Sequence, residues 1–272
     1  MDINAIRALF DEQERMNLDL VGFKREDTGM VVRYVPPSPV RYSFVLYDRL
    51  QHADAAAIDA QIEEQVAYFR TLSSGFEWKF CTHDVSPLLI ERLLAHGFTK
   101  DEEDSAIMVL ELDSLPATLQ APLQHDIRRK HPGDDVSDVL AVLNGAFGED
   151  LSRALNVIYT EMCADPARVS MYIAYVDGQP ASCGWTRFPS SGHDFASLWA
   201  GSTLPHYRHR GLYTELINVR AHEAAERGYK FVTVDAGSMS RPITEKHGFR
   251  QITTMCAYFY SYEHEQAKDS AS

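Results

Sequence analysis

The residues best suited to chemistry are concentrated in residues 203–213, which read TLPHYRHRGLY. Arg208, His209 and Arg210 place three basic side chains directly before Gly211. A glycine lets a ligand approach the backbone where a Cβ would collide with it. Basic side chains beside an accessible backbone favour an anion, and a diphosphate group has the matching charge.

This basic turn is expected to lie between a strand and a helix. Residues 196–204 form an apolar segment that predicts a strand, and residues 212–227 predict a long helix. The first turn of a helix leaves backbone N–H groups without intrahelical acceptors, and the helix dipole adds partial positive charge there. The order of strand, basic turn and helix therefore strengthens the prediction of a diphosphate site.

The rest of the pattern predicts an α/β protein. Other expected helices are residues 3–16, 55–72 (with Asp54 as N-cap), 87–96, 136–147, 151–163 and 241–247. Other expected strands are residues 30–35, 40–47, 76–81, 106–112, 126–130, 170–176, 181–188, 229–234 and 249–262, with a hairpin at 177–180.

Residues 114–124 contain two prolines and little periodicity, so they predict a boundary between domains of residues 1–124 and 125–272. The segments LAHGF (94–98) and EKHGF (245–249) both follow a helix and precede a strand. The elements before them also occur in the same order, which suggests an internal repeat. Coincidence is the alternative, since glycine after a helix is common.

Composition limits the classes of function. The chain has 272 residues and a formal net charge of −13, which disfavours general nucleic-acid binding. The four cysteines form no C-x-x-C pair, so we expect no disulfide scaffold and no metal. No signal peptide or apolar membrane span is recognised. These features predict a cytoplasmic protein that avoids membranes and is a monomer or homodimer.

The second half resembles the GNAT acetyltransferase superfamily, whose members transfer an acetyl group from acetyl-CoA to an amine. The family signature Q/R-x-x-G-x-G/A corresponds to RHRGLY at residues 208–213, where Tyr213 replaces the small last residue. The preceding hairpin, Pro205 and the KHGF segment at 246–249 also lie where the family has them. The resemblance covers about residues 126–262, whereas the first half is similar only in its order of elements.

The resemblance implies a GNAT-like α/β (α+β) fold, with a mixed, mostly antiparallel central sheet flanked by helices. Two tandem copies are implied, of which the N-terminal copy lacks a basic glycine turn and is degenerate. Acetyl-CoA is the implied co-substrate. Its pantetheine arm is expected to pair with the strand before the basic turn, and its diphosphate to accept from the N–H groups of residues 209–214. The strand after the long helix is expected to separate from the strand before the turn and so leave room for the thioester. The implied binding residues are Ser202, Thr203, Leu204, Arg208, His209, Arg210, Gly211, Leu212, Tyr213, Thr214 and Ser238.

The family often places a catalytic tyrosine, as general acid, in the short helix near the C-terminal end. Alignment on residues 248–249 puts this place near Thr244, and threonine is a weak acid, so another group or water is the alternative proton donor. The candidate bases are Asp235, at the end of an apolar strand, and Glu149, between two expected helices. The neighbouring Asp150, and His193 and Asp194 before the expected strand 196–204, are further candidates. The first two also have a purely structural explanation: Asp235 as a turn-forming residue and Glu149 as part of a solvated loop. His247 is expected to stabilise the end of its helix.

The sequence therefore predicts an N-acetyltransferase acting on a primary amine of a small molecule or peptide by direct attack. The first alternative is a non-catalytic acyl-CoA-binding sensor, because the usual tyrosine is missing. A dinucleotide-binding or NTP-binding protein is disfavoured, since the chain has neither a G-x-G-x-x-G run nor a P-loop lysine.

Overall fold

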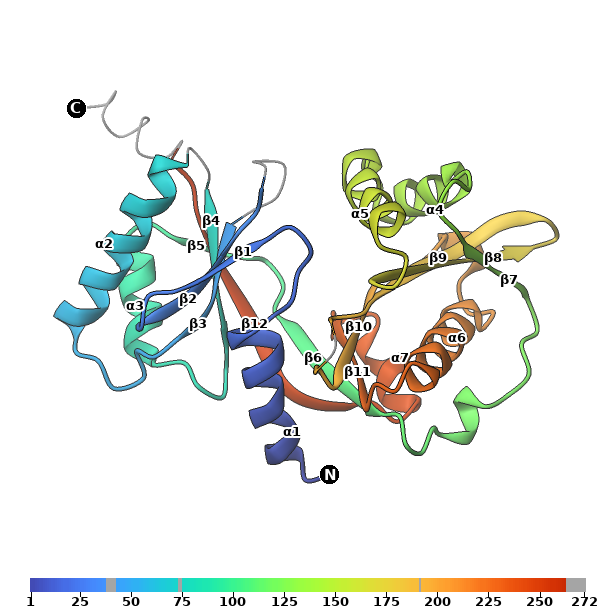
Figure 1. Ribbon diagram of the computed structural model, residues 1–272, viewed down its shortest axis with the longest axis horizontal. Helices are drawn as coiled ribbons and strands as arrows, with labels where there is room; N and C mark the ends of the chain where they lie inside the picture. Colours follow the sequence, from blue (N-terminus) through green and yellow to red (C-terminus); the bar gives the residue numbers. More distant parts are fainter. Residues whose placement is uncertain (38–42, 73–74, 191, 263–272) are drawn as a thin grey trace. The chain divides into compact units, whose positions relative to one another are not determined.

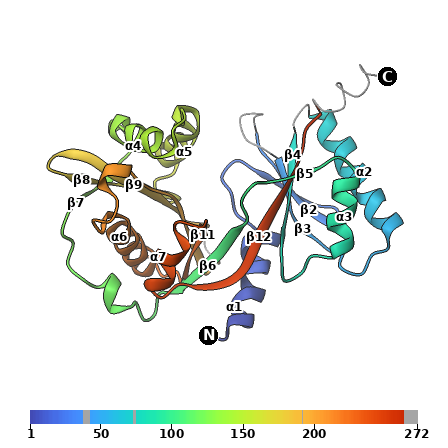
Figure 2. The same cartoon turned by 180° about the vertical axis from the view of Figure 1, so that it is seen from behind.

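The computed structural model describes residues 1–37, 43–72, 75–190 and 192–262. The chain forms two compact units (Figures 1 and 2). Unit 1 contains Met1–Ile107 and the segment that starts at Ile252, and unit 2 contains Met108–Gln251. These bounds differ from the division after residue 124 that the sequence predicted, because the last strand of the chain packs in the first unit.

Unit 1 is a mixed sheet with helices. Its elements are α1 (Ile3–Phe10), the π-helical turn η1 (Asp11–Met16), β1 (Lys24–Asp27), β2 (Val31–Val35), β3 (Ser43–Asp48), α2 (Ala55–Thr71), β4 (Phe76–Cys81), α3 (Pro87–Ala95), β5 (Thr99–Lys100) and most of β12 (Arg250–Tyr260). β1, β2 and β3 are antiparallel, β3 and β4 are parallel, and β12 pairs antiparallel with β4 and β5. Residues 40–42 of the expected strand 40–47 lie outside the described residues, and β1 was not predicted.

Unit 2 contains the predicted basic turn. Its elements are most of β6 (Ser105–Glu111), η2 (Ala117–Leu119), β7 (Asp126–Lys130), α4 (Ser137–Phe147), α5 (Ser152–Ala164), β8 (Val169–Val176), β9 (Gln179–Arg187), β10 (Phe195–Thr203), η3 (Pro205–Tyr207), α6 (Leu212–Glu226), β11 (Phe231–Ala236) and α7 (Arg241–Lys246). The strand order is β7-β8-β9-β10-β11-β6, antiparallel from β7 to β10 and parallel between β10 and β11. The sheet is thus mixed and mostly antiparallel, as expected.

Helices cover both faces of the unit 2 sheet. α4 and α5 lie on one face, and α6 and α7 lie on the other (Figure 1). Val139, Val142 and Leu143 of α4 are buried with Ile173 and Cys183. On the other face, the buried side chains include Leu212, Leu216, Ala174 and Ala181. Because successive strand residues alternate between faces, β8 and β9 supply apolar side chains to both layers.

The two units share an order of elements. In each, antiparallel strands lead to a parallel pair that a long helix connects: β3, α2 and β4 in unit 1, and β10, α6 and β11 in unit 2. The strand beside β4 is β12, from the end of the chain, whereas β6 lies beside β11. Next to β6, Leu112 N donates to the Lys230 carbonyl at 2.9 Å.

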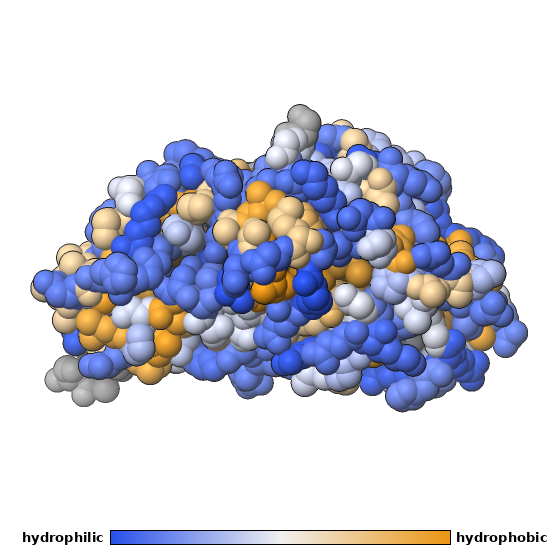
Figure 3. Space-filling model, turned by 90° about the horizontal axis from the view of Figure 1, so that it is seen from below, coloured by the Kyte–Doolittle hydropathy of each residue, from blue (hydrophilic) through white to orange (hydrophobic). Residues whose placement is uncertain are grey.

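The surface is largely polar. Hydrophilic residues cover most of the face shown in Figure 3, with apolar residues in smaller groups, in keeping with the net charge of −13. Within the described residues, no helix combines the length and apolar character needed to cross a membrane.

Glu26 of β1 provides a test of stability in unit 1. Burial alone would raise the pKa of its carboxyl, but hydrogen bonds from Lys24, Arg33 and Tyr68 outweigh burial and lower this pKa to about 2. Arg33 Nε lies 2.8 Å from Glu26 Oε2. Because the folded pKa lies below the unfolded value, the stabilisation is present above about pH 4.3 and is lost as the pH falls towards 2.

We therefore expect Glu26→Gln to lower the unfolding free energy by about 1 kcal/mol near neutral pH, after allowance for solvent screening. The difference from the parent protein should shrink on acidification, as measured by denaturant unfolding at about pH 6 and about pH 2.5. Glu63→Gln, at an exposed position of α2, is the control. A Glu26→Gln deficit that stays constant with pH would contradict this account.

Candidate functional site

The basic turn has the predicted strand–turn–helix geometry. β10 ends at Thr203, η3 follows, and Gly211 is the residue before α6, with φ +86°. A left-handed backbone of this kind favours glycine, which explains Gly211 at the point where the chain enters the helix. His209 also has a positive φ of 64°, so the turn is held in a tight conformation.

The turn leaves its backbone donors available. Among the described residues, none accepts a hydrogen bond from the N–H groups of residues 209–214, and Glu215 N makes the first bond of the helix, to Gly211 O. No side chain caps α6. Gly211 is exposed, and nothing lies within 4 Å of the Cβ position it lacks. The geometry therefore fits an anion at the positive end of the helix dipole.

Two arginines and a histidine flank these donors. Arg208, His209 and Arg210 are exposed, and none forms an ion pair with a residue that the structure describes. Arg208 Nε donates to the Thr203 carbonyl at 3.3 Å, and the Arg210 guanidinium lies 5.4 Å from the centroid of the Tyr207 ring. The charges of Arg208 and Arg210 are therefore not neutralised within the turn and remain available to an anionic ligand.

Tyr213 does not obstruct the turn. Its ring packs against Gly201 of β10, where an added Cβ would lie 2.5 Å from Tyr213 Cε2. The sequence had suggested that this side chain stands at the ligand's point of approach. Instead, a glycine on the neighbouring strand accommodates the ring, and burial raises the pKa of the Tyr213 hydroxyl. A large residue is thus compatible with this signature position.

β10 is irregular next to this pair. Its register with β9 shifts between Trp199 and Ser202, and Ala200 adopts φ +49°. The fully buried Arg220 of α6 lies against this bulge: Nη1 is 3.3 Å from the carbonyl oxygens of both Trp199 and Trp185. Burial lowers the pKa of Arg220, and no carboxylate in the described part of the chain pairs with it.

β10 and β11 pair only over their first residues. The paired residues are Phe195–Phe231, Ala196–Val232 and Ser197–Thr233, although β10 continues to Thr203 and β11 to Ala236. Beyond these pairs, the strands no longer hydrogen-bond to each other within the described residues. The later part of β10 therefore has an open edge towards β11, as the predicted separation of these strands requires.

The backbone of β10 is only partly open. Leu204 N donates to the Ala181 carbonyl at 3.0 Å, and the Leu204 carbonyl accepts from Tyr207 N at 2.9 Å. Leu204 therefore has internal partners for both backbone groups, contrary to the expectation that it pairs with a ligand. Ser202 pairs with Cys183, and Thr203 with Ser182, on the β9 side.

The three predicted catalytic residues lie in different environments. Asp235, at the end of β11, and Glu149, between α4 and α5, are exposed, and so is Ser238 in the following turn. Thr244 is fully buried, and its hydroxyl donates to the Arg241 carbonyl at 2.8 Å. Its proton therefore already has an internal acceptor, which argues against Thr244 as a proton donor to a ligand.

His247 occupies a place that the sequence did not indicate. It is 6% exposed, and its Nε2 lies 2.9 Å from Thr214 Oγ1 in the first turn of α6. Burial and the Lys246 charge lower the pKa of the imidazole, which favours its neutral form. His247 therefore both ends α7 and, through its hydrogen bond with Thr214, holds the first turn of α6, where the free backbone N–H groups lie. Nothing in the local sequence signals this long-range contact.

Comparisons with known proteins agree with this geometry. Residues 136–249 match the model of the Acetyltransferase (GNAT) family. A search of curated proteins found no match. Among solved structures, a GCN5-related N-acetyltransferase from Kribbella flavida is similar with a TM-score of 0.68 and 15% identity, covering 94% of this chain and 95% of that one.

Two further structures have the same fold over most of their length. A functionally unknown conserved protein from Staphylococcus epidermidis gives a TM-score of 0.68 and 16% identity, with coverage of 88% of this chain and 94% of that one. A tandem GNAT protein from the clavulanic acid biosynthesis pathway gives a TM-score of 0.59 and 12% identity, with coverage of 88% of this chain and 83% of that one. At such low identities these likenesses establish the fold alone.

Proposed function

Residues 136–249 belong to the acetyltransferase (GNAT) family, and on this premise we propose that the chain transfers an acetyl group from acetyl-CoA to a primary amine. The acceptor is a small molecule or a peptide. The observation that carries the proposal is the exposed turn before α6. Its backbone N–H groups have no acceptor, and Arg208 and Arg210 have no acidic partner, among the described residues. This combination suits the diphosphate of the co-substrate.

Other residues fit the remaining parts of the co-substrate. In this proposal Ser202 and Thr203 lie along the pantetheine arm, because the adjacent edge of β10 is not paired with β11. The turn residues Arg208 to Thr214 hold the diphosphate, and Ser238, exposed after β11, lies within the same site. Leu204 contributes packing only, since its polar backbone groups are occupied.

The chemistry asks little of the protein beyond position and one proton acceptor. Acetyl-CoA supplies the activated acetyl group as a thioester. An amine attacks only in its neutral form, so a carboxylate or a histidine must accept its proton, directly or through water. The C–S bond of the thioester breaks, and the CoA thiolate that leaves takes up a proton from water. Holding both reactants in one geometry supplies much of the rate. We assign the proton acceptor to Asp235, because it ends the strand that separates from β10.

Asp235→Asn is therefore expected to lower kcat about 100-fold, the lower range for loss of a general base, with no change in acetyl-CoA affinity. Steady-state kinetics and calorimetric titration measure the two quantities separately. Glu149→Gln is the matched carboxylate control and should retain most of the activity. If Glu149→Gln loses the rate instead, Glu149 is the base and our assignment is wrong.

The acyltransferase and the sensor alternative are separated by two measurements. Acetyl-CoA at 100 times its Kd should stabilise the folded chain by about 2.7 kcal/mol, seen as a raised Tm, in either case. Only the enzyme releases free thiol from acetyl-CoA when amines are added. Stabilisation by acetyl-CoA without thiol release in the presence of any amine of a broad panel would favour the sensor. An absence of stabilisation would contradict both the acyltransferase and the sensor.

We also propose that unit 1 is a degenerate copy of unit 2, because its own carboxylates occupy the corresponding turn. Asp54 Oδ1 accepts from Ala57 N at 2.9 Å at the start of α2, whereas α6 has no side-chain cap. The buried Asp48 carboxylate accepts from Leu50 N at 3.2 Å. The Asp54 carboxylate would repel a diphosphate at this helix terminus, so binding is assigned to unit 2 alone.

The four cysteines are free in the structure, which suits the reducing cytoplasm that we propose as the location.

A further inference from the structure

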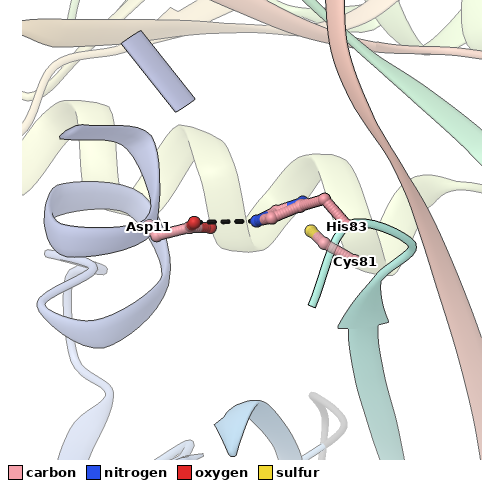
Figure 4. Close-up of side chains that lie close together, drawn as sticks. All are labelled: Asp11, Cys81 and His83. Atoms are coloured by element: carbon pink, nitrogen blue, oxygen red, sulfur yellow. Dashed lines mark hydrogen bonds and ion pairs between the residues drawn. The ribbon is translucent and has the colours of Figure 1, made fainter. Parts of the chain in front are cut away.

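Three potential metal ligands from distant parts of the sequence converge in unit 1. Figure 4 shows Asp11 of η1, Cys81 at the end of β4 and His83 in the following turn. One ligand atom from each residue lies within 4.8 Å of the others. His83 Nε2 is 2.8 Å from Asp11 Oδ2. From the sequence we expected no metal, because the four cysteines form no C-x-x-C pair. Asp11 is also remote in sequence from the C-x-H segment at 81–83.

The second nitrogen of the imidazole is also held. His83 Nδ1 lies 2.8 Å from Thr253 Oγ1, and this hydroxyl is oriented towards the Thr254 carbonyl at 3.5 Å. A histidine that ligates a metal through Nε2 carries its proton on Nδ1 and donates it to a neighbouring acceptor. In the metal-free cluster a neutral His83 donates Nε2–H to Asp11 and accepts from the Thr253 hydroxyl at Nδ1. Ligation through Nε2 moves the imidazole proton to Nδ1, where the Thr253 hydroxyl oxygen can accept it.

A buried arginine orients the carboxylates around the cluster. Arg15 is 1% exposed, and its Nη1 lies 2.6 Å from Asp11 Oδ1 and 2.5 Å from Asp84 Oδ2. It thereby occupies one oxygen of Asp11 and leaves the other facing His83. Asp84 Oδ2 lies 3.9 Å from His83 Nε2, which adds a second negative charge near the imidazole.

The charges of the cluster suit a divalent cation. Two carboxylates and one guanidinium leave a single excess negative charge when the thiol and the imidazole are neutral. Burial raises the pKa of the Cys81 thiol to about 12, so the metal-free cysteine is protonated. A divalent ion that displaces the thiol proton would bring the cluster to electrical neutrality.

We propose that Asp11, Cys81 and His83 form a binding site for a divalent transition-metal ion, with a water molecule completing a tetrahedral set. Thiolate and imidazole ligands select Zn²⁺ or Co²⁺ over Mg²⁺ or Ca²⁺, which prefer oxygen ligands. Bond lengths of about 2.0–2.3 Å require side-chain movements on the order of 1 Å from the hydrogen-bonded cluster. The ion would join η1 to the end of β4 and stabilise unit 1.

The test uses Co²⁺ as an optical probe and Zn²⁺ for thermal stability. The full chain should bind a single Co²⁺ with a thiolate charge-transfer band, and Zn²⁺ should displace the ion and raise the Tm. His83→Ala is expected to weaken binding at least about 100-fold, and Thr253→Val about tenfold. Cys81→Ser should abolish the band. Absence of Co²⁺ binding, or a spectrum without thiolate ligation, overturns the proposal.

Matched controls separate this site from adventitious binding. His96→Ala removes another histidine of unit 1 that contacts a carboxylate. His96 Nε2 lies 2.9 Å from Asp59 Oδ1, and Arg92 donates to the same carboxylate, but no cysteine is part of this group. Cys163→Ser removes the exposed cysteine. Both variants should bind Co²⁺ like the parent protein. Equal loss in His96→Ala and His83→Ala, with circular dichroism showing folded chains, would overturn the assignment.

Discussion

Replacement of Gly211 by leucine is expected to weaken acetyl-CoA binding about 100-fold or more, or about 2.7 kcal/mol. The added side chain would stand beside the free N–H groups of residues 209–214, where the diphosphate is proposed to lie. A non-glycine residue at φ +86° also costs about 1–2 kcal/mol of folding stability. Calorimetric titration with acetyl-CoA measures the first effect, and denaturant unfolding measures the second.

Gly228 supplies a matched control at the other end of α6. It has the same φ of +86°, and nothing lies within 4 Å of its missing Cβ. Gly228→Leu should therefore show the same backbone strain without the loss of affinity. Because both variants carry the same strain, a difference in Kd reports on the ligand site alone. Unchanged acetyl-CoA affinity in Gly211→Leu would refute the proposed diphosphate site.

Gly201→Ala is expected to disturb both folding and binding, although it adds a single methyl group. The new Cβ would lie 2.5 Å from the Tyr213 ring, so the ring or the start of α6 must move. Overpacking of this kind costs about 1–3 kcal/mol of unfolding free energy. Movement of the first helical turn would also misplace its amides, so we expect acetyl-CoA affinity to fall about tenfold.

A second substitution tests the cause of this effect. Tyr213→Ala removes the ring that the new methyl group meets, so the double variant Gly201→Ala/Tyr213→Ala should recover affinity relative to Gly201→Ala alone. The double-mutant cycle should give a coupling energy of about 1 kcal/mol or more, as expected for residues in contact. Additive effects would show that the two positions act independently and would contradict the packing described here.

The contrast between the two units shows why only one turn is suited to an anionic ligand. Both units place a long helix between two parallel strands, so both helices direct their positive ends to the same topological position. In unit 1, Asp54 caps α2, and its carboxylate accepts from the Ala57 N–H in the first turn. In unit 2, Gly211 has no side chain with which to cap α6. Side-chain chemistry at one position therefore distinguishes two similar backbones.

The sequence alone determined the features that depend on neighbouring residues. Apolar segments, helix periodicity and glycine positions identified the strand, the basic turn and the helix at residues 196–227, and the structure confirms all three elements. These features are local, because backbone conformation and helix termini are set within a few residues along the chain. The resemblance to the GNAT superfamily rested on the same local segment.

The tertiary structure alone decided which groups are accessible and which distant residues meet. It gave internal partners to Leu204, buried Thr244, and packed Tyr213 against Gly201. It also brought Asp11 beside His83. Such contacts depend on strand register and on the packing of helices over the sheet, which combine residues far apart in sequence. No local pattern encodes them, because each partner becomes a neighbour only when the chain folds.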